Sequence, residues 1–259
     1  MLEMILGGKP GSSLISDTGP GPTVLIGSYS RAPNQLAGYY GTLSITEMGL
    51  SGPSEFYSLT GTGSYGINIV NPNLWYKFHI DGKTLFTPSR PCRARIAWQT
   101  LYALGMVSGT DDNGLPPSGV AAVKQDKKIT IGGYIYRVRL WHGAPANPTR
   151  LGSVSGGYDV NDPTVLYGSE WNRLLYNIVS TTGLAGQEGA KWANITPGSL
   201  GVNYSYGKNV ICVECNSGDS RWVFLRSGST AISNTSATIA TLTSDDQGWW
   251  PVLELYGKA

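Results

Sequence analysis

The stretch LWYKFHIDGKTLF, residues 74–86, decides the fold class of this sequence. Two runs that mix aromatic, aliphatic and polar residues, 74–80 and 83–86, flank the dipeptide Asp81-Gly82. Asp and Gly tolerate the positive φ angles of a two-residue type I′ turn, so this stretch predicts a β-hairpin.

A second hairpin is predicted further along the chain. Residues 128–131 and 134–141 are rich in β-branched and aromatic side chains, and Gly132-Gly133 separates them. The two glycines supply the positive φ angles that the turn needs. Strand pairing therefore dominates the middle of the chain. Further short strands are predicted at residues 23–26, 39–45, 210–213, 222–225 and 250–255, and residues 227–243 are a polar strand or a loop.

Two segments have helical periodicity instead. Apolar residues recur three and four positions apart from Trp171 to Val179, after Ser169, which can cap a helix, and before Gly183, which can end one. Residues 96–104 show a shorter version of the same pattern. Helices combined with short paired strands predict an α+β fold that is mostly antiparallel β.

The composition indicates a folded chain with many turns. Its 259 residues include 35 Gly and 15 Pro, yet 8 Trp and 15 Tyr provide bulk that a disordered tract would lack. The net charge is only +2, and the longest basic run is Lys127-Lys128, so we expect no nucleic-acid partner. No segment approaches the roughly 20 apolar residues that span a bilayer, and residues 1–9 lack the pattern of a signal peptide. We therefore expect no membrane insertion and synthesis in the cytoplasm.

Breaker residues divide the chain into three predicted parts. Residues 1–38 are nearly uncharged and rich in Gly and Pro, which predicts an extended docking arm, or alternatively a flexible tail. Residues 39–86 predict a small β-rich domain, and residues 87–259 predict an α+β domain. The apolar faces of the predicted elements are expected to bury Trp98, Trp171, Leu174, Leu175, Ile178, Trp192, Trp222, Val252 and Leu253.

No pattern in the sequence predicts catalysis, a cofactor or a bound metal. His79 and His142 lie in predicted strands without a local nucleophile motif. Residues 110–114, TDDNG, resemble the start of a calcium loop but lack the later glutamate, so they predict an ordinary turn. One hypothesis for the function is a hydrolase, which would need two carboxylates converging across a cleft. Its candidates are Asp159, Asp162, Glu170 and Glu188, and adjacent pairs also occur at 111–112 and 245–246.

The three cysteines do not form a recognisable site. Cys212 and Cys215 have the spacing of half a zinc site or of a redox pair, but a structural zinc ion takes four ligands and Cys92 is remote in sequence. Residues three apart in a strand point to opposite faces. The sequence therefore predicts buried, apolar cysteines, at least one of them a free thiol.

Seven pieces of the chain, between residues 39 and 255, resemble in their order a group of tailed-bacteriophage virion proteins described as structural or tail-associated. These pieces are YYGTL (39–43), LWYKF with DGKTLF (74–86), 93–98, 129–140, SEWNRL (169–174), KWA (191–193) and GWWPVLEL (248–255). The resemblance implies a non-enzymatic structural subunit of a virion, in a baseplate or tail fibre, that is made in the host cytoplasm.

The same resemblance implies that the arm binds other virion proteins and that the chain forms a homo-oligomer. A trimer is expected because tail fibres are commonly trimeric. Two alternative functions stay open: an adhesin that binds a host receptor or glycan, and a capsid decoration protein.

The closing motif and the helix before it also resemble the C-type-lectin-like fold, which formylglycine-generating enzymes share. This implies a C-type-lectin-like domain over residues 87–259. The Glu-Pro-Asn and Trp-Asn-Asp motifs of calcium-dependent lectins are missing, so calcium-mediated sugar binding is not implied. Cys212 and Cys215 do not match the copper site of the formylglycine enzymes, so an oxidase activity is not implied either.

Overall fold

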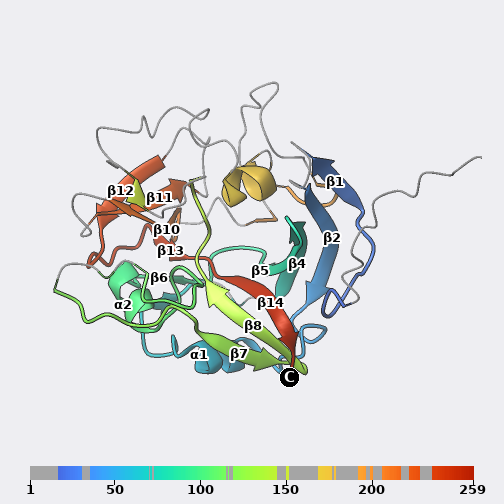
Figure 1. The fold of residues 1–259 in the computed structure, drawn as a ribbon, viewed down its shortest axis with the longest axis horizontal. Coiled ribbons are helices and arrows are strands. Elements are labelled where there is room, and N and C mark those ends of the chain that lie inside the picture. Colours follow the sequence, from blue (N-terminus) through green and yellow to red (C-terminus); the bar gives the residue numbers. More distant parts are fainter. Residues whose placement is uncertain are drawn as a thin grey trace, which may run out of the picture.

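The computed structural model arranges the strands in two sheets, with short helices packed beside them (Figure 1). The chain is mostly antiparallel β with few helices, which confirms the predicted α+β class at that level. The structure describes residues 17–30, 36–69, 71, 73–114, 116, 119–144, 150–151, 169–176, 178, 192–196, 199–200, 206–216, 222–227 and 235–259.

The first sheet has seven antiparallel strands in the order β1-β2-β4-β5-β14-β8-β7. Asp81-Gly82 joins β4 to β5, with φ of 47° and 85°, and Gly132-Gly133 joins β7 to β8, with φ of 57° and 80°. Positive φ at all four positions confirms both predicted hairpins. The strands are β1 Gly27–Ser30, β2 Leu36–Ser44, β4 Leu74–Ile80, β5 Lys83–Pro88, β7 Lys128–Ile131, β8 Tyr134–Arg139 and β14 Val252–Lys258.

The second sheet has the order β12-β11-β10-β13-β6-β3, and β9 pairs with β10 outside this path. Two of its pairs, β10 with β13 and β10 with β9, are parallel, and the others are antiparallel. The strands are β3 Ile67–Asn68, β6 Arg93–Ala94, β9 Arg150–Leu151, β10 Asn209–Asn216, β11 Trp222–Ser227, β12 Thr235–Ile239 and β13 Gln247–Trp249. The predicted strands at 210–213 and 222–225 are thus confirmed as β10 and β11, and the segment 227–243 contains β12.

Helical segments occur at three places in the described chain. Helix α1, Pro53–Thr60, was not predicted, and α2, Trp98–Ala103, confirms a shorter form of the helix expected at 96–104. After Ser169 the chain is helical, mostly as the π-helix η2, Asn172–Tyr176. The amide of Asn172 donates to Ser169 Oγ at 3.1 Å, which confirms the expected cap. The expected stop at Gly183 lies outside the described residues.

Two strand predictions are corrected. The strand expected at 250–255 is observed as β14, but it begins two residues later, at Val252, and β13 ends just before it, at Trp249 in the second sheet. Pro251 lies between them and has no N–H to donate to a ladder, so the chain changes sheets there. The strand expected at 23–26 is displaced to Gly27–Ser30, where the chain pairs with β2.

Two apolar cores result, because both sheets carry buried side chains on both faces. Trp249 belongs to the first core, with Trp75 and Phe56, whereas its neighbour Trp250 belongs to the second, with Trp141. All expected core residues whose side chains the structure describes are at most 3 % exposed; the side chain of Trp222 is not among those described. The confirmed core residues are Trp98, Trp171, Leu174, Leu175, Ile178, Trp192, Val252 and Leu253.

The boundary predicted at residue 86 falls inside β5. This strand pairs with β14, with Phe86 opposite Leu253. Strands from the segments 39–86 and 87–259 therefore share the first sheet, and their side chains share the first core. Within the described residues, the segment 39–86 has no sheet or core of its own.

Residues 17–30, called the N-terminal strap below, lie against the first sheet of their own chain. At the beginning of the strap, the carboxylate of Asp17 is 2.8 Å from Lys258 Nζ on β14, and at its end β1 pairs with β2. This part of the predicted docking arm thus contacts its own sheet, whereas residues 1–16 lie outside the described residues.

Lys77 on β4 fixes the strap near its middle. Its side chain is 0 % exposed, and its Nζ lies over the rings of Tyr40 and Phe86, 5.0 and 5.5 Å from their centroids. Burial lowers the pKa of Lys77 from 10.5 to about 8, although the negative charge of Asp17 acts to raise this pKa. The three N–H groups of the ammonium face four oxygens of the strap within hydrogen-bond distance: Thr18 Oγ1 at 3.0 Å and the carbonyls of Gly19, Pro20 and Pro22 at 3.2, 2.9 and 2.7 Å.

The buried Lys77 makes stability depend on pH. Between about pH 8 and 10.5 the folded chain has lost this proton while the unfolded chain still holds it, so unfolding takes up a proton. The free energy of unfolding should therefore rise with pH in this interval, by up to about 3 kcal/mol from this group. Urea titrations from pH 7 to 11, with Lys77→Met as the comparison, measure it. Equal pH slopes for the two proteins would contradict the assignment.

Candidate functional site

A buried ionic network joins the first sheet to the segment after Ser169. The guanidinium of Arg139 on β8 is 3 % exposed, and it contacts both carboxylate oxygens of Glu170, at 2.6 and 2.8 Å. Its Nε also donates to Glu254 on β14 at 3.0 Å. Burial alone would raise the pKa of Glu170, but the charge and hydrogen bonds of Arg139 outweigh it and lower that pKa. Glu170 therefore stays ionised inside the protein.

Two buried carboxylates hold three successive backbone amides. Glu170 accepts from the amide of His142 at 3.2 Å, and Glu214 on β10 accepts from Gly143 and Ala144 at 3.0 and 3.2 Å. Glu214 is 0 % exposed. Hydrogen bonds from backbone amides offset the cost of burying a carboxylate. The segment 142–144 is thereby fixed between the two sheets.

Arg226 on β11 completes this network from the other side. Its Nε donates to the carbonyl of Gly143 at 2.8 Å, and its Nη2 donates to the side chains of Asn172 and Ser169. The polar residues of the SEWNRL motif are therefore buried partners of charges on the sheets. The helix was expected to be amphipathic, but every residue from 169 to 175 is buried. Glu170 is a candidate of the hydrolase hypothesis, but in the structure its carboxylate accepts hydrogen bonds from Arg139 and from the amide of His142.

The hairpin turn is tied to the same helical segment. Arg173 donates from both terminal nitrogens to the carboxylate of Asp81, with the Nη2 contact at 2.7 Å. In the turn, the amide of Gly82 donates to Nε2 of His79 at 3.3 Å, and burial lowers the pKa of His79. The imidazole is therefore a neutral acceptor near pH 7. His79 therefore stabilises the same turn whose Asp81 carboxylate binds Arg173.

The other histidine lies beside the buried network. His142 is about one-third exposed, and its Nδ1 is 3.5 Å from a carboxylate oxygen of Glu214. Glu214 is at the same time occupied by the two amides that follow His142. This arrangement fixes the imidazole together with its backbone.

The segment 110–114 is an ordinary turn, as predicted. The carboxylate of Asp112 accepts from Thr110 Oγ1 at 2.6 Å and from the amide of Gly114 at 2.8 Å. These bonds lower the pKa of Asp112. Among the residues that the structure describes, no three His, Cys, Asp or Glu side chains gather in a way that could hold a metal ion.

The remaining carboxylates singled out from the sequence do not meet in the described chain. Asp245 pairs with Arg95 at 2.5 Å, Asp111 with Lys124 at 2.6 Å, and Asp246 with Lys208 at 3.6 Å. Asp159, Asp162 and Glu188 lie outside the described residues.

All three cysteines are buried, and none of them forms a disulfide bond in the described chain. Cys215 belongs to the first core, with Cys92, whereas Cys212 belongs to the second. The opposite faces expected for residues three apart in a strand are thus confirmed on β10. Burial raises the pKa of Cys92 and of Cys212, which disfavours their thiolates.

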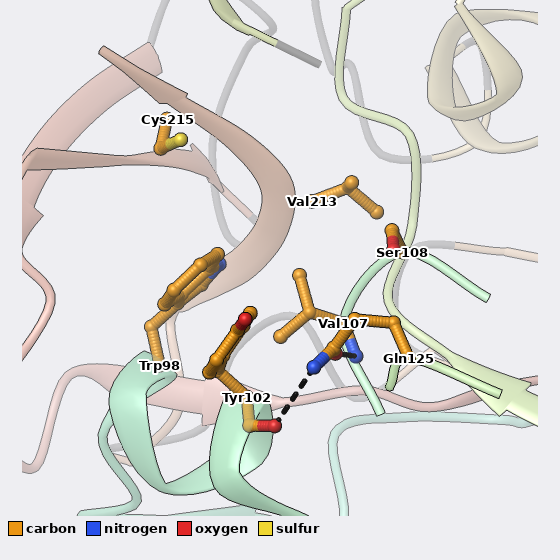
Figure 2. A pocket seen from close by; sticks show the side chains of 7 residues that line it. All are labelled: Trp98, Tyr102, Val107, Ser108, Gln125, Val213 and Cys215. Atoms are coloured by element: carbon orange, nitrogen blue, oxygen red, sulfur yellow. Dashed lines mark hydrogen bonds between the residues drawn. The ribbon is translucent and has the colours of Figure 1, made fainter. Parts of the chain in front are cut away.

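A small cavity lies between α2 and β10, with Cys215 and Val213 on one side and Gln125 on the other (Figure 2). Its volume is about 10 Å³, at the lower limit of the space that can hold one water molecule. The amide of Gln125 donates to the carbonyl of Tyr102 at 2.9 Å and accepts from the amide of Val107 at 3.0 Å (Figure 2). The cavity is too small for a substrate, and its polar wall belongs to the structural framework.

The strap carries two of the three most exposed large hydrophobic side chains among the described residues. Val24 is 74 % exposed and Ile26 is 54 % exposed. They immediately precede β1, which is the outermost strand of the first sheet among the described residues. Exposed apolar side chains that lie together are typical of a surface that meets another molecule.

Comparisons with known proteins leave the site to be interpreted from its own geometry. No protein-family model, no curated protein and no solved structure matches this chain. The helices described here are all too short or too polar to cross a bilayer.

The buried charges are the central positions that the sequence patterns do not single out. Lys77 lies within a predicted strand, but nothing in the predicted elements marks it, Arg139, Glu214 or Arg226 as a buried structural centre. The available signal is a single charge inside an apolar strand, as in ICVEC for Glu214 and WVFLR for Arg226. Such a charge must find a partner when both faces of the strand are covered.

The burial of the cysteines predicts low thiol reactivity. In native protein without reductant, Ellman's reagent should label none of the three cysteines within minutes, because each is at most 1 % exposed. In guanidinium chloride all three should react. A native thiol that reacts as fast as free cysteine would contradict the burial described for β10 and for Cys92.

Removing the side chain of Glu170 should strongly lower the free energy of unfolding. Glu170→Ala leaves the buried guanidinium of Arg139 with Glu254 alone and deprives the amide of His142 of its acceptor, so a loss of about 3–5 kcal/mol is expected. Denaturant titration measures it. Asp111→Ala removes an exposed ion pair with Lys124 and should leave the midpoint unchanged. Equal midpoints for Glu170→Ala and the native protein would refute the role of the network.

Proposed function

We propose that this chain is a non-enzymatic structural subunit of a bacteriophage virion, located in the tail as part of a baseplate or tail fibre. The supporting observation is the strap: it is fixed to its own sheet by Lys77 and presents Val24 and Ile26 outward beside β1, the outermost strand of that sheet in the described chain. A fixed and exposed apolar surface suits contact with a neighbouring subunit. The ordered resemblance of the seven sequence pieces supplies the phage assignment.

The buried ionic network agrees with this function. Its carboxylates hold an arginine and backbone amides, and so they stiffen the connection between the sheets. A subunit fixed in a symmetric assembly needs such rigidity, because its contacts must repeat in every copy. We propose that the neighbours are other virion proteins and further copies of this chain, with a trimer as the expected state.

A C-type-lectin-like arrangement of residues 87–259 is part of the same proposal. It is supported by the C-terminal strand β14, which lies inside the first sheet between β5 and β8, and by the helical segment after Ser169, which packs against Trp250 through Trp171. Because β5 begins at Lys83, such a domain would share its sheet with the preceding strands.

The strap predicts which variant fails to assemble. Val24→Ser combined with Ile26→Ser should fold normally, because both side chains are exposed, yet should be missing from particles. The matched control is Leu74→Ser, which changes another exposed apolar residue, 38 % exposed, at the start of β4. Tagged variants are expressed during infection, and purified particles are analysed by mass spectrometry. Electron cryo-microscopy of wild-type particles then locates the chain.

Absence of the wild-type chain from purified particles would refute the virion proposal, and normal incorporation of the double variant would refute the role of the strap. If a truncation is used in place of the double variant, it should delete residues 1–16 only. Deletion to residue 30 would remove the oxygens that surround the buried ammonium of Lys77, and any loss of assembly could then be a loss of folding.

A further inference from the structure

An open depression lies on the surface where α2 meets the turn after β12. Its volume is about 340 Å³, which falls within the range of about 300–1,000 Å³ typical of small-molecule sites. One aromatic ring and four uncharged polar side chains line it: Tyr65, Gln99, Thr100, Thr241 and Thr243. Ala97 and Ala103 add small apolar surface between them.

The lining makes the depression neutral. None of the residues lining it is charged. The nearby guanidinium of Arg95 is neutralised by Asp245, with its Nη2 at 3.1 Å from the carboxylate. An anionic or cationic ligand would find no opposite charge here, and a purely apolar ligand would leave the amide of Gln99 and the threonine hydroxyls unpaired.

The walls are held in place by backbone contacts. The amide of Tyr65 donates to Thr62 O at 3.0 Å, and its carbonyl accepts from Arg93 Nε at 2.6 Å. Opposite, the amide of Gln99 donates to Ala240 O at 3.0 Å, which ties α2 to the turn that follows β12. A site that is formed before binding loses less entropy on binding.

We propose that this depression binds one ring of a neutral saccharide. Tyr65 is 42 % exposed and lines the depression, which makes its ring the group that would stack on the apolar C–H face of a pyranose. The amide of Gln99 and the hydroxyls of Thr100, Thr241 and Thr243 both donate and accept, as sugar hydroxyls require. Within the described chain, these polar groups form no side-chain hydrogen bond with protein, so they are available to a ligand.

The inference does not rest on the virion proposal, because a saccharide site can occur on any soluble subunit. Its test uses the purified full-length chain. A printed array of neutral and acidic bacterial surface glycans identifies ligands, and isothermal titration calorimetry with the neutral oligosaccharides that bind gives the affinity. Tyr65→Ala should weaken binding about tenfold through lost stacking, and Gln99→Ala about fivefold through lost hydrogen bonds.

Two control variants separate recognition from folding. Tyr65→Phe keeps the stacking face and should bind within about twofold of the native protein. Tyr256→Ala removes another exposed tyrosine, on β14 of the first sheet, and should bind as the native protein does. The proposal is overturned if no neutral glycan binds at millimolar concentration, if only acidic glycans bind, or if Tyr65→Ala binds as tightly as the native protein.

Discussion

The passage of the chain through Trp249, Trp250 and Pro251 is the constraint on which the two-sheet structure depends. Neighbouring residues of an extended chain point to opposite sides, so Trp249 enters the first core and Trp250 the second. Pro251 ends the pairing in the second sheet, and β14 then inserts between β5 and β8 of the first. Trp250 packs edge-to-face on Trp141 and Trp171, from two other parts of the chain. One short segment thus determines how both sheets and the helical segment meet.

Buried charges position the parts that the apolar cores do not reach. Arg139 lies opposite Val252 in the first sheet, close to the point where the chain changes sheets, and its partners come from β14 and from the segment after Ser169. Lys77 acts similarly on the strap, whose glycines and prolines offer little apolar surface but several carbonyls. Removing one group of these contacts leaves its partner unsatisfied in the interior, so the loss costs far more than the intact contact adds in net stability.

The sequence predicts those features whose cause is local. Asp81-Gly82 and Gly132-Gly133 determine their turns within two residues, and both hairpins are observed as expected. Helix α1 also has local signals, because Pro53 stands in its first turn and Gly61 ends it. The path of the strap was not predictable, because it depends on Lys77, 55 residues or more away along the chain. The break at Pro251 carries a local signal, but which sheet each half joins is decided by distant strands.

The same distinction applies to function. The depression combines Tyr65, α2 and the turn after β12, which are far apart in the sequence, and the strap surface depends on the distant Lys77 that holds it. The strap surface lies beside β1 at one end of the molecule, and the depression lies beside α2 at the other (Figure 1). Because each is formed on a framework held by its own buried arginine or lysine, Arg93 near Tyr65 and Lys77 under the strap, occupation of one need not disturb the other. A subunit with this arrangement can be anchored at one end and still expose its binding face at the other.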